Sequence, residues 1–466
     1  MTEITFQNFD KFERSGFADR LTTVIKKFFP FYDEAFVLSL NAKYGSGKTT
    51  FLKMWKDKLE IDGNQVIYIN AWETDFDDEP ILPIVSAILS DVSKTTLGDE
   101  VKGALKTAIG ATALAANSLF DKITGIDVKD IAEAVEKDQK SKSVEAVGED
   151  LYAEYSYKKK AFEELREKLS DFANALENKP LVIIVDELDR VRPDYAVRFL
   201  EAIKHLFSVK GLVFVLAVDR KQLEISIRQL YGDIDFENYY RRFITREANL
   251  PDVHKVQVLP FLQELSKNFF DEKRADGLSF PFEKQRQPML LEFIADLCKT
   301  YRLLPREIES FFRIFSQFML VYTPEKVGKQ AVSEWVCAAA TLIAIYIKDQ
   351  DLYHLIGKQK ATTEQIMSHI NSLDYFESGE TGLSRRENAV RIFGACISID
   401  DKWNKTLSKT FLEQIDGKAK SAANWEEDTN SMIHALADPF GRRYGTTQSC
   451  FFFCYNRLEE WLEFIG

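Results

Sequence analysis

The residues most suited to chemistry lie in the segment Leu40–Thr50, which reads LNAKYGSGKTT. Phosphate-binding loops follow the pattern G-x-x-x-x-G-K-[ST], in which backbone N–H groups point at phosphate oxygens and the lysine reaches the outer phosphates. Ala42 replaces the first glycine, which is acceptable if its φ is negative. We predict that a nucleotide is bound by Lys43, Tyr44, Gly45, Ser46, Gly47, Lys48, Thr49 and Thr50.

The residues on either side of this loop support the interpretation. Phe36–Leu40 is a short apolar run typical of a buried strand, and the apolar residues after the loop recur at helical spacing. The chain contains three other Gly-Lys pairs, none followed by Ser or Thr or directly preceded by such a run. A strand, a glycine loop and a helix in this order favour a phosphate site over a chance match.

A second group of candidate residues follows the apolar run Leu181–Val185, in the sequence LVIIVDELDR. Asp186 would stand at the carboxyl end of a strand, where open α/β sheets bind ligands. Asp186 could hold Mg²⁺ through water, with the Thr49 hydroxyl as a direct ligand, and Glu187 could orient or deprotonate the attacking water. The alternative is an acidic loop that merely begins after a core strand.

Strands and helices alternate in the first half of the chain, which predicts an α/β fold with a parallel sheet. Further strands are expected at Val66–Asn70 and Leu212–Val218, both apolar enough to be buried on two faces. We expect a helical insertion at about 81–178, where strand signals are missing. After Asn249–Pro251 long amphipathic segments predict helices up to Gly466.

The composition is that of a globular protein of 466 residues with a net charge of −12. This acidic balance argues against a broad surface that binds nucleic acid. Nucleic acid stays possible as a partner, but nothing in the sequence indicates it. The N-terminus has no apolar segment typical of a secretory signal, and five cysteines suit a reducing compartment; we expect a cytoplasmic protein. Cys450 and Cys454 lie four residues apart, on one face if that segment is a helix. We favour packing in the core over metal binding as the role of these two cysteines.

One segment, Gly103–Phe120, could suggest a membrane helix. It is shorter than the 20 or so apolar residues that a span needs, and it contains Lys106. A helix packed against protein is the favoured interpretation, and no transmembrane segment is expected.

Taken together, the motifs resemble those of the KAP family of P-loop NTPases. The matching sequences, in order, are YGSGKTTFL, INAWETD, VDELDRVRPDYAVRFLEAIKHLF, GLVFVLAVDRKQLEISIRQLYG and YYRRFITREANLP. The likeness covers roughly the first 250 residues and a weaker stretch at YRLLPREIESFFRIF. Ala42 and Glu187 depart from the family pattern, since many relatives have a glycine and a second aspartate there.

The resemblance implies a parallel sheet of the additional-strand P-loop class with the helical insertion, followed by a mainly α-helical C-terminal region. It implies ATP hydrolysis with Mg²⁺ and, from bacterial relatives associated with phage exclusion, a role in anti-phage defence. The expected domains are a KAP-type P-loop NTPase domain at 1–250, a helical lid-like subdomain at 251–321 and a helical domain at 322–466. A homo-oligomer, an effector protein encoded alongside, or both are the expected partners.

Family-like positions suggest further site residues. Asp219, directly after the strand expected at Leu212–Val218, could sense the γ-phosphate or simply cap the next helix. Arg242, with Arg241 and Arg246 as alternatives, could project into a neighbouring subunit's site; a surface or salt-bridged arginine is the other interpretation. Arg306, after Pro305 at an expected helix start, resembles a lid arginine aimed at the phosphates.

Three functions are consistent with these residues. The first is an ATPase whose catalytic residues are Lys48, Glu187, Arg242 and Arg306. The second is an ATP-gated scaffold that hydrolyses slowly or not at all and holds a partner through its helical half. The third, a small-molecule kinase, is disfavoured because a large helical half stands where such enzymes have a short arginine-rich lid.

Overall fold

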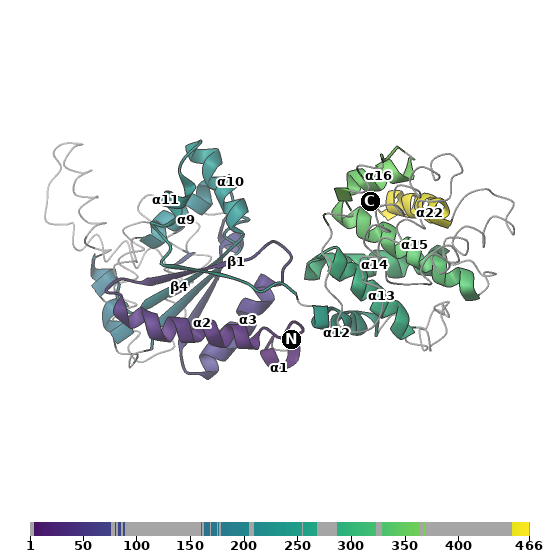
Figure 1. Ribbon diagram of the computed structural model, residues 1–466. Helices are drawn as coiled ribbons and strands as arrows, with labels where there is room; N and C mark the ends of the chain where they lie inside the picture. Colours follow the sequence, from purple (N-terminus) through teal and green to yellow (C-terminus); the bar gives the residue numbers. More distant parts are fainter. Residues whose placement is uncertain are drawn as a thin grey trace, which may run out of the picture. The chain divides into compact units, whose positions relative to one another are not determined.

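The chain divides into two compact units, Met1–Pro251 and Asp252–Gly466. Figure 1 shows the elements of both in a computed structural model. The structure describes residues 4–75, 80, 83–84, 87–88, 160, 163–167, 169–174, 176, 179–204, 209–253, 255–267, 287–322, 329–358, 360–362, 365, 368–369, 372 and 450–465.

The first unit is built on a five-stranded parallel sheet of order β2-β3-β4-β1-β5. Its strands are β1 (Phe36–Asn41), β2 (Gln65–Asn70), β3 (Leu181–Asp186), β4 (Leu212–Val218) and β5 (Arg246–Asn249). Insertion of β4 between β1 and β3 is the arrangement that defines the additional-strand class. The predicted fold class is confirmed, and so are the four apolar strands.

The strand β5 was not predicted, because its four residues carry no apolar pattern and are largely exposed. It forms the edge of the sheet, where a ladder with β1 is enough to hold a polar strand. Pairing runs from Leu38 opposite Arg246 to Asn41 opposite Asn249.

Alternate residues of the central strands enter two separate hydrophobic clusters, one on each face of the sheet. In β3, Ile183 and Val185 belong to one cluster, and Val182 and Ile184 belong to the other. This double burial explains why the strands are continuous apolar runs rather than alternating ones.

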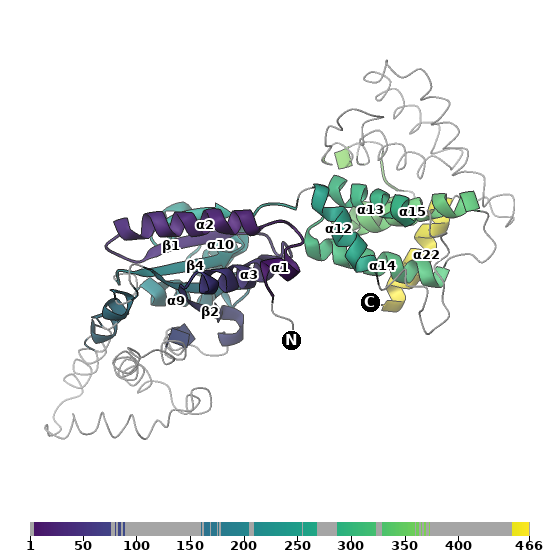
Figure 2. The same cartoon turned by 90° about the horizontal axis from the view of Figure 1, so that it is seen from below.

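Helices of the first unit cover both faces (Figures 1 and 2). On one face lie α2 (Ser15–Phe28) and α3 (Lys48–Ile61), whose apolar residues join the cluster that contains Val182 and Ile184. On the other lie α9 (Pro193–Lys204), α10 (Arg220–Tyr231) and α11 (Phe236–Tyr240). The same unit contains the short helices α1 (Phe6–Phe9), η1 (Phe29–Phe31) and η2 (Ala71–Thr74).

Only part of the expected insertion at about 81–178 belongs to the described residues. Residues 163–167 and 169–174 are helical, and Leu165, Leu169 and Phe172 are buried in the cluster beneath α9. The segment Gly103–Phe120 lies outside the described residues.

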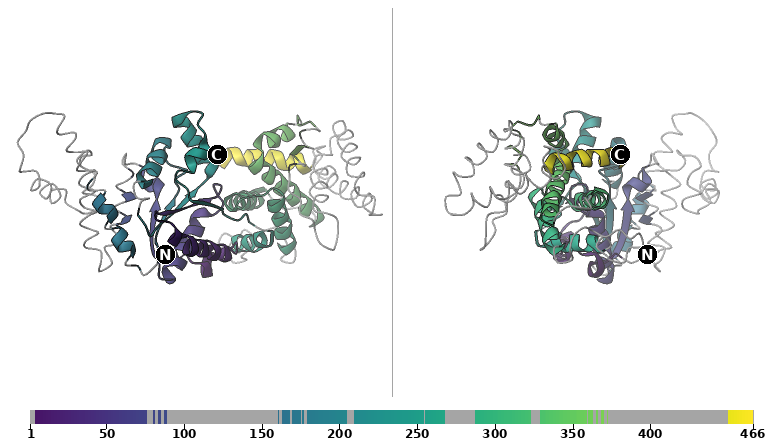
Figure 3. Two further views of the ribbon diagram at one scale, coloured as in Figure 1. Left: turned by 60° about the vertical axis from the view of Figure 1, so that its left-hand side comes forward. Right: turned by 90° about the vertical axis from the view of Figure 1, so that its right-hand side faces the viewer.

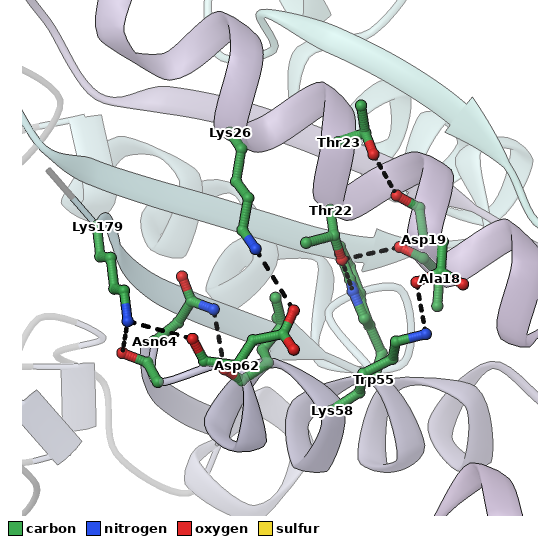
Figure 4. Close-up of polar contacts among 12 residues, drawn as sticks. Ala18, Asp19, Thr22, Thr23, Lys26, Trp55, Lys58, Asp62, Asn64 and Lys179 are labelled. Atoms are coloured by element: carbon green, nitrogen blue, oxygen red, sulfur yellow. Dashed lines mark hydrogen bonds and ion pairs between the residues drawn. The ribbon is translucent and has the colours of Figure 1, made fainter.

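Polar contacts join α2 to α3, the helix that follows the glycine loop (Figure 4). Trp55 is fully buried, and its indole Nε1 donates a hydrogen bond of 2.9 Å to the Thr22 hydroxyl. At the far end, Lys26 lies 3.4 Å from Asp62. The packing of α2 therefore fixes the helix whose N-terminus closes the loop.

All the regular secondary structure that is described in the second unit is helix, as expected for the C-terminal region. Its helices are α12 (Lys255–Ser266), α13 (Gln287–Thr300), α14 (Pro305–Tyr322), α15 (Lys329–Lys348), α16 (Gln350–Gly357) and α22 (Cys450–Ile465). The last helix packs against α15 and α16 (Figure 3), with the Tyr353 and Tyr455 rings 4.9 Å apart between centroids.

Two further expectations concern single features of the described chain. Cys454 is buried and reduced in α22, in agreement with a packing role, and the described residues contain no group of three or more His, Cys, Asp or Glu side chains that could hold a metal ion. Among the helices that the structure describes, none combines the length and apolar content needed to cross a bilayer.

Replacing the buried Trp55 tests how much the packing of α2 against α3 stabilises the first unit. Trp55→Ala is expected to lower the free energy of unfolding by about 3–5 kcal/mol, because it removes a fully buried indole and leaves a cavity. Urea-induced unfolding of the full chain, followed by circular dichroism, measures this change. Trp72→Ala is the matched control: Trp72 is 58% exposed, and we expect a loss below about 1 kcal/mol. Equal losses in both variants would contradict the packing described.

Candidate nucleotide site

The glycine loop connects the end of β1 to the start of α3. Gly45 and Gly47 have φ values of 80° and 82°, in the left-handed region that glycine adopts without strain. Gly47 is the N-cap of α3, so the first N–H groups of that helix face the loop without intrahelical partners. Loop amides and a helix N-terminus together form a site for anions.

The structure accounts for the alanine at the first position of the motif. Ala42 is not among the residues with positive φ, so its side chain causes no backbone strain. Its N–H donates to the Val218 carbonyl at 2.9 Å, which continues the β1–β4 ladder by one residue. The substitution of glycine by alanine therefore leaves the loop geometry intact.

The side chains of the loop differ in exposure. Ser46 and Lys48 are buried, Thr49 is half-buried, and Lys43, Tyr44 and Thr50 are exposed. The Ser46 hydroxyl has no hydrogen-bond partner among the described residues, although it is inaccessible to solvent. A buried hydroxyl of this kind is a ready donor for a phosphate oxygen.

A buried arginine from outside the motif holds the loop. Arg14 is 4% exposed, and its guanidinium donates to the Ser46 carbonyl at 2.8 Å and to the Pro251 carbonyl at 2.9 Å. Sequence analysis missed Arg14, because a single arginine before an amphipathic helix carries no motif. It connects the loop to the last residue of the first unit.

The acidic residue at the end of β3 is fully buried and held in place. One carboxylate oxygen of Asp186 accepts from the Tyr68 hydroxyl and the other from the Glu187 N–H, both at 2.8 Å. Burial, reinforced by the charge of Asp186, raises the pKa of Tyr68, which therefore stays a donor at neutral pH. A carboxylate has about four lone-pair positions, so Asp186 can also accept from the water of a metal ion.

The next residue has an unusual backbone. Glu187 has a φ of 62°, a strained conformation for a residue with a side chain, which costs roughly 1–3 kcal/mol. Its carboxylate accepts from Arg190 at 2.8 Å. The Arg190 guanidinium in turn lies 4.3 Å from the ring centroid of Tyr44 and 5.7 Å from that of Trp72.

A polar contact between loop and turn joins Lys48 to Asp189. The ammonium Nζ lies 3.1 Å from the carboxylate Oδ1, and the two side chains are only 9% and 4% exposed. The turn therefore contacts the loop through Asp189 and also through Arg190. Both residues stand in the DELDR sequence, but only the turn, closed by a hydrogen bond from the Arg190 N–H to the Glu187 carbonyl, directs them at the loop.

The structure also places the remaining predicted residues. Asp219 caps α10 by accepting from the Lys221 N–H at 3.1 Å, which is the alternative interpretation given above; this cap neither requires nor excludes a phosphate contact. Arg242 is exposed in the turn after α11, next to Arg241, and Arg246 in β5 lies 5.7 Å from the Phe28 ring centroid.

Arg306 belongs to the second unit. It is exposed at the second residue of α14, whose first residue is Pro305, as expected for a proline at a helix start. Its role at the phosphates stays a prediction.

A parallel sheet of this order, with a glycine loop after β1 and a carboxylate at the end of β3, defines a P-loop NTPase. Residues 14–322 match the KAP family P-loop domain, which is about two thirds of the chain. The protein belongs to the KAP family, as the sequence motifs suggested, and this membership supports nucleotide binding in general. Comparison with curated proteins found no match.

Gly47 offers a direct test of nucleotide binding by the loop. Gly47→Ala would hold an alanine at left-handed φ, at roughly 1–2 kcal/mol, and place its Cβ 3.2 Å from Arg14 Nη1. We expect nucleotide affinity to fall at least about tenfold in isothermal titration calorimetry.

Gly232→Ala is the matched control, because Gly232 has a similar φ of 73° but ends α10 in open space. It should lose stability and keep its affinity. Unchanged affinity in Gly47→Ala would show that nucleotide does not bind against this loop.

Proposed function

We propose that the protein is a Mg²⁺-dependent ATPase whose hydrolysis drives conformational switching or assembly. The observation that carries the proposal is the convergence of the phosphate loop and the acidic turn, seen most directly in the contact of Lys48 with Asp189 at 3.1 Å. A cationic loop lysine and two further carboxylates, Asp186 and Glu187, then surround the position of the outer phosphates.

Each residue has a role that follows from its position. The loop amides and Lys48 bind the phosphates, and the Thr49 hydroxyl, together with Asp186 through a water, would hold Mg²⁺, an ion that prefers oxygen ligands. When bound, Mg²⁺ neutralises charge on the outer phosphates. Glu187 orients or deprotonates the attacking water, which requires its carboxylate to leave Arg190 or to share it.

The described contacts offer a route for coupling the loop to the rest of the chain. Asn41, just before the loop, bonds the Asn249 side chain at 2.8 Å, the Leu250 N–H at 2.9 Å and the Arg220 N–H at 3.1 Å. Arg14 adds the bond to Pro251. A shift of the loop on phosphate binding would therefore reach the segment that leads into the helical unit.

The proposal extends to partners by analogy with the family. Arg242 acts on the site of a neighbouring copy, Arg306 contributes from the helical unit, and Asp219 senses the γ-phosphate. An effector protein encoded alongside and an anti-phage role follow from the bacterial relatives that the motifs resemble. The exposed position of Arg242 is what an arginine acting in trans requires.

A second function, the ATP-gated scaffold that hydrolyses slowly or not at all, is favoured by one observation. Glu187 is engaged by Arg190, so its carboxylate would have to leave that guanidinium, or share it, before it could act on water.

Steady phosphate release from ATP by the purified chain separates the two functions. We expect release with Mg²⁺, none with EDTA, and a fall of at least about 100-fold in both Lys48→Ala and Glu187→Gln. Calorimetry should show that Glu187→Gln keeps its affinity for ATP, because Glu187 acts on water, whereas Lys48→Ala loses affinity. Tight binding without turnover by the natural chain would favour the scaffold.

Mixing two inactive variants tests whether Arg242 acts between copies. Arg242→Ala has an intact loop, and Lys48→Ala has an intact arginine, so their mixture should regain part of the phosphate release that each lacks alone. Arg246→Ala, which removes the exposed arginine over Phe28, should remain active by itself. A mixture no more active than its components would argue against a role in trans.

A further inference from the structure

We propose that Asp189 makes the site selective for metal-bound nucleotide over metal-free nucleotide. The inference rests on the proposed function, since it assumes that Lys48 binds the outer phosphates. It assigns a role to a carboxylate that the metal and water positions of the proposed mechanism do not use.

The geometry places Asp189 close to any phosphate that Lys48 binds. A lysine ammonium has three N–H donors, so Lys48 can hold a phosphate oxygen while it keeps its contact with Asp189 at 3.1 Å. Two hydrogen bonds to one nitrogen put the two acceptor oxygens within about 6 Å of each other. The carboxylate and the phosphate thus become near neighbours.

Burial determines how strongly these two anions interact. The Asp189 side chain is 4% exposed and that of Lys48 is 9% exposed, so water screens the charges only weakly. One lysine charge cannot neutralise both a carboxylate and a bare triphosphate. We therefore expect Asp189 to oppose the binding of metal-free nucleotide.

A bound Mg²⁺ changes the sign of this effect. It removes two units of negative charge from the triphosphate and usually keeps several of its waters, which donate hydrogen bonds to nearby carboxylates. Asp186, held by the Tyr68 hydroxyl and the Glu187 N–H, would serve the metal itself. Asp189, beside Lys48, would accept a hydrogen bond from a metal-bound water.

The alternative is that Asp189 only orients Lys48. Its removal would then weaken binding of both nucleotide forms by a similar factor. Selectivity, in contrast, predicts opposite behaviour: without the charge, metal-free nucleotide binds more tightly and the advantage of the metal-bound form shrinks. The ratio of the two dissociation constants therefore distinguishes the two roles.

The experiment uses the full chain and the β,γ-imido analogue of ATP, so that no turnover occurs. Calorimetry gives the dissociation constant with Mg²⁺ and with EDTA for the natural chain and for Asp189→Asn. We expect Asp189→Asn to bind the analogue about tenfold more tightly in EDTA, and the EDTA-to-Mg²⁺ ratio of dissociation constants to fall by at least about tenfold.

Two further variants complete the test. Asp75→Asn weakens an ion pair at the same end of the sheet, Asp75 with Arg192 at 3.1 Å, and should leave the ratio unchanged. Asp189→Glu keeps the charge and should keep the ratio, which tests the proposal independently if Asp189→Asn does not fold. Similar weakening of both forms in Asp189→Asn, or loss of selectivity in Asp189→Glu, would overturn the inference. If the natural chain binds neither form, the proposed function fails and the inference falls with it.

Discussion

The position of β4 between β1 and β3 sets the dimensions of the candidate site. Neighbouring strands lie about 4.8 Å apart, so the ends of β1 and β3 are separated by about 10 Å. The phosphate loop leaves one end and the acidic turn leaves the other, with space between them for phosphate groups. Because of this gap, residues further along the turn, Asp189 and Arg190, are the ones that contact the loop.

The charged contacts around this gap are poor sources of stability. A buried ion pair such as Lys48 with Asp189 loses much of its attraction to desolvation, and the left-handed backbone of Glu187 adds strain. The free energy of folding comes instead from the two clusters on the faces of the sheet, which bury the central strands and the apolar faces of the helices. The first unit therefore combines a stable core with charged residues at the strand ends that contribute little to stability. We interpret these charges as arranged for nucleotide binding.

The loop is also connected to the end of the first unit. Arg14 reaches from the start of α2 to the Ser46 and Pro251 carbonyls, and Asn41 contacts both Asn249 and Leu250. The Arg14 side chain is buried, so a displacement of the loop is passed to Pro251 and is not absorbed by a loose side chain. This connection gives the nucleotide site a physical means of acting beyond itself, which a switching function needs.

The amino-acid sequence by itself determined the features that depend on neighbouring residues. Apolar runs predicted β1 to β4, the glycine spacing predicted the loop, and ordered motifs identified the KAP family. It did not reveal β5, whose polar residues form a strand only because β1 offers an open edge. It also did not reveal the partners of Lys48 and Arg14, because Asp189 follows Lys48 by 141 residues and Pro251 follows Arg14 by 237. The local sequence pattern predicts whether a segment forms a strand or a helix. Contacts between residues that are more than a hundred positions apart in the sequence form only after the sheet has brought the strand ends together.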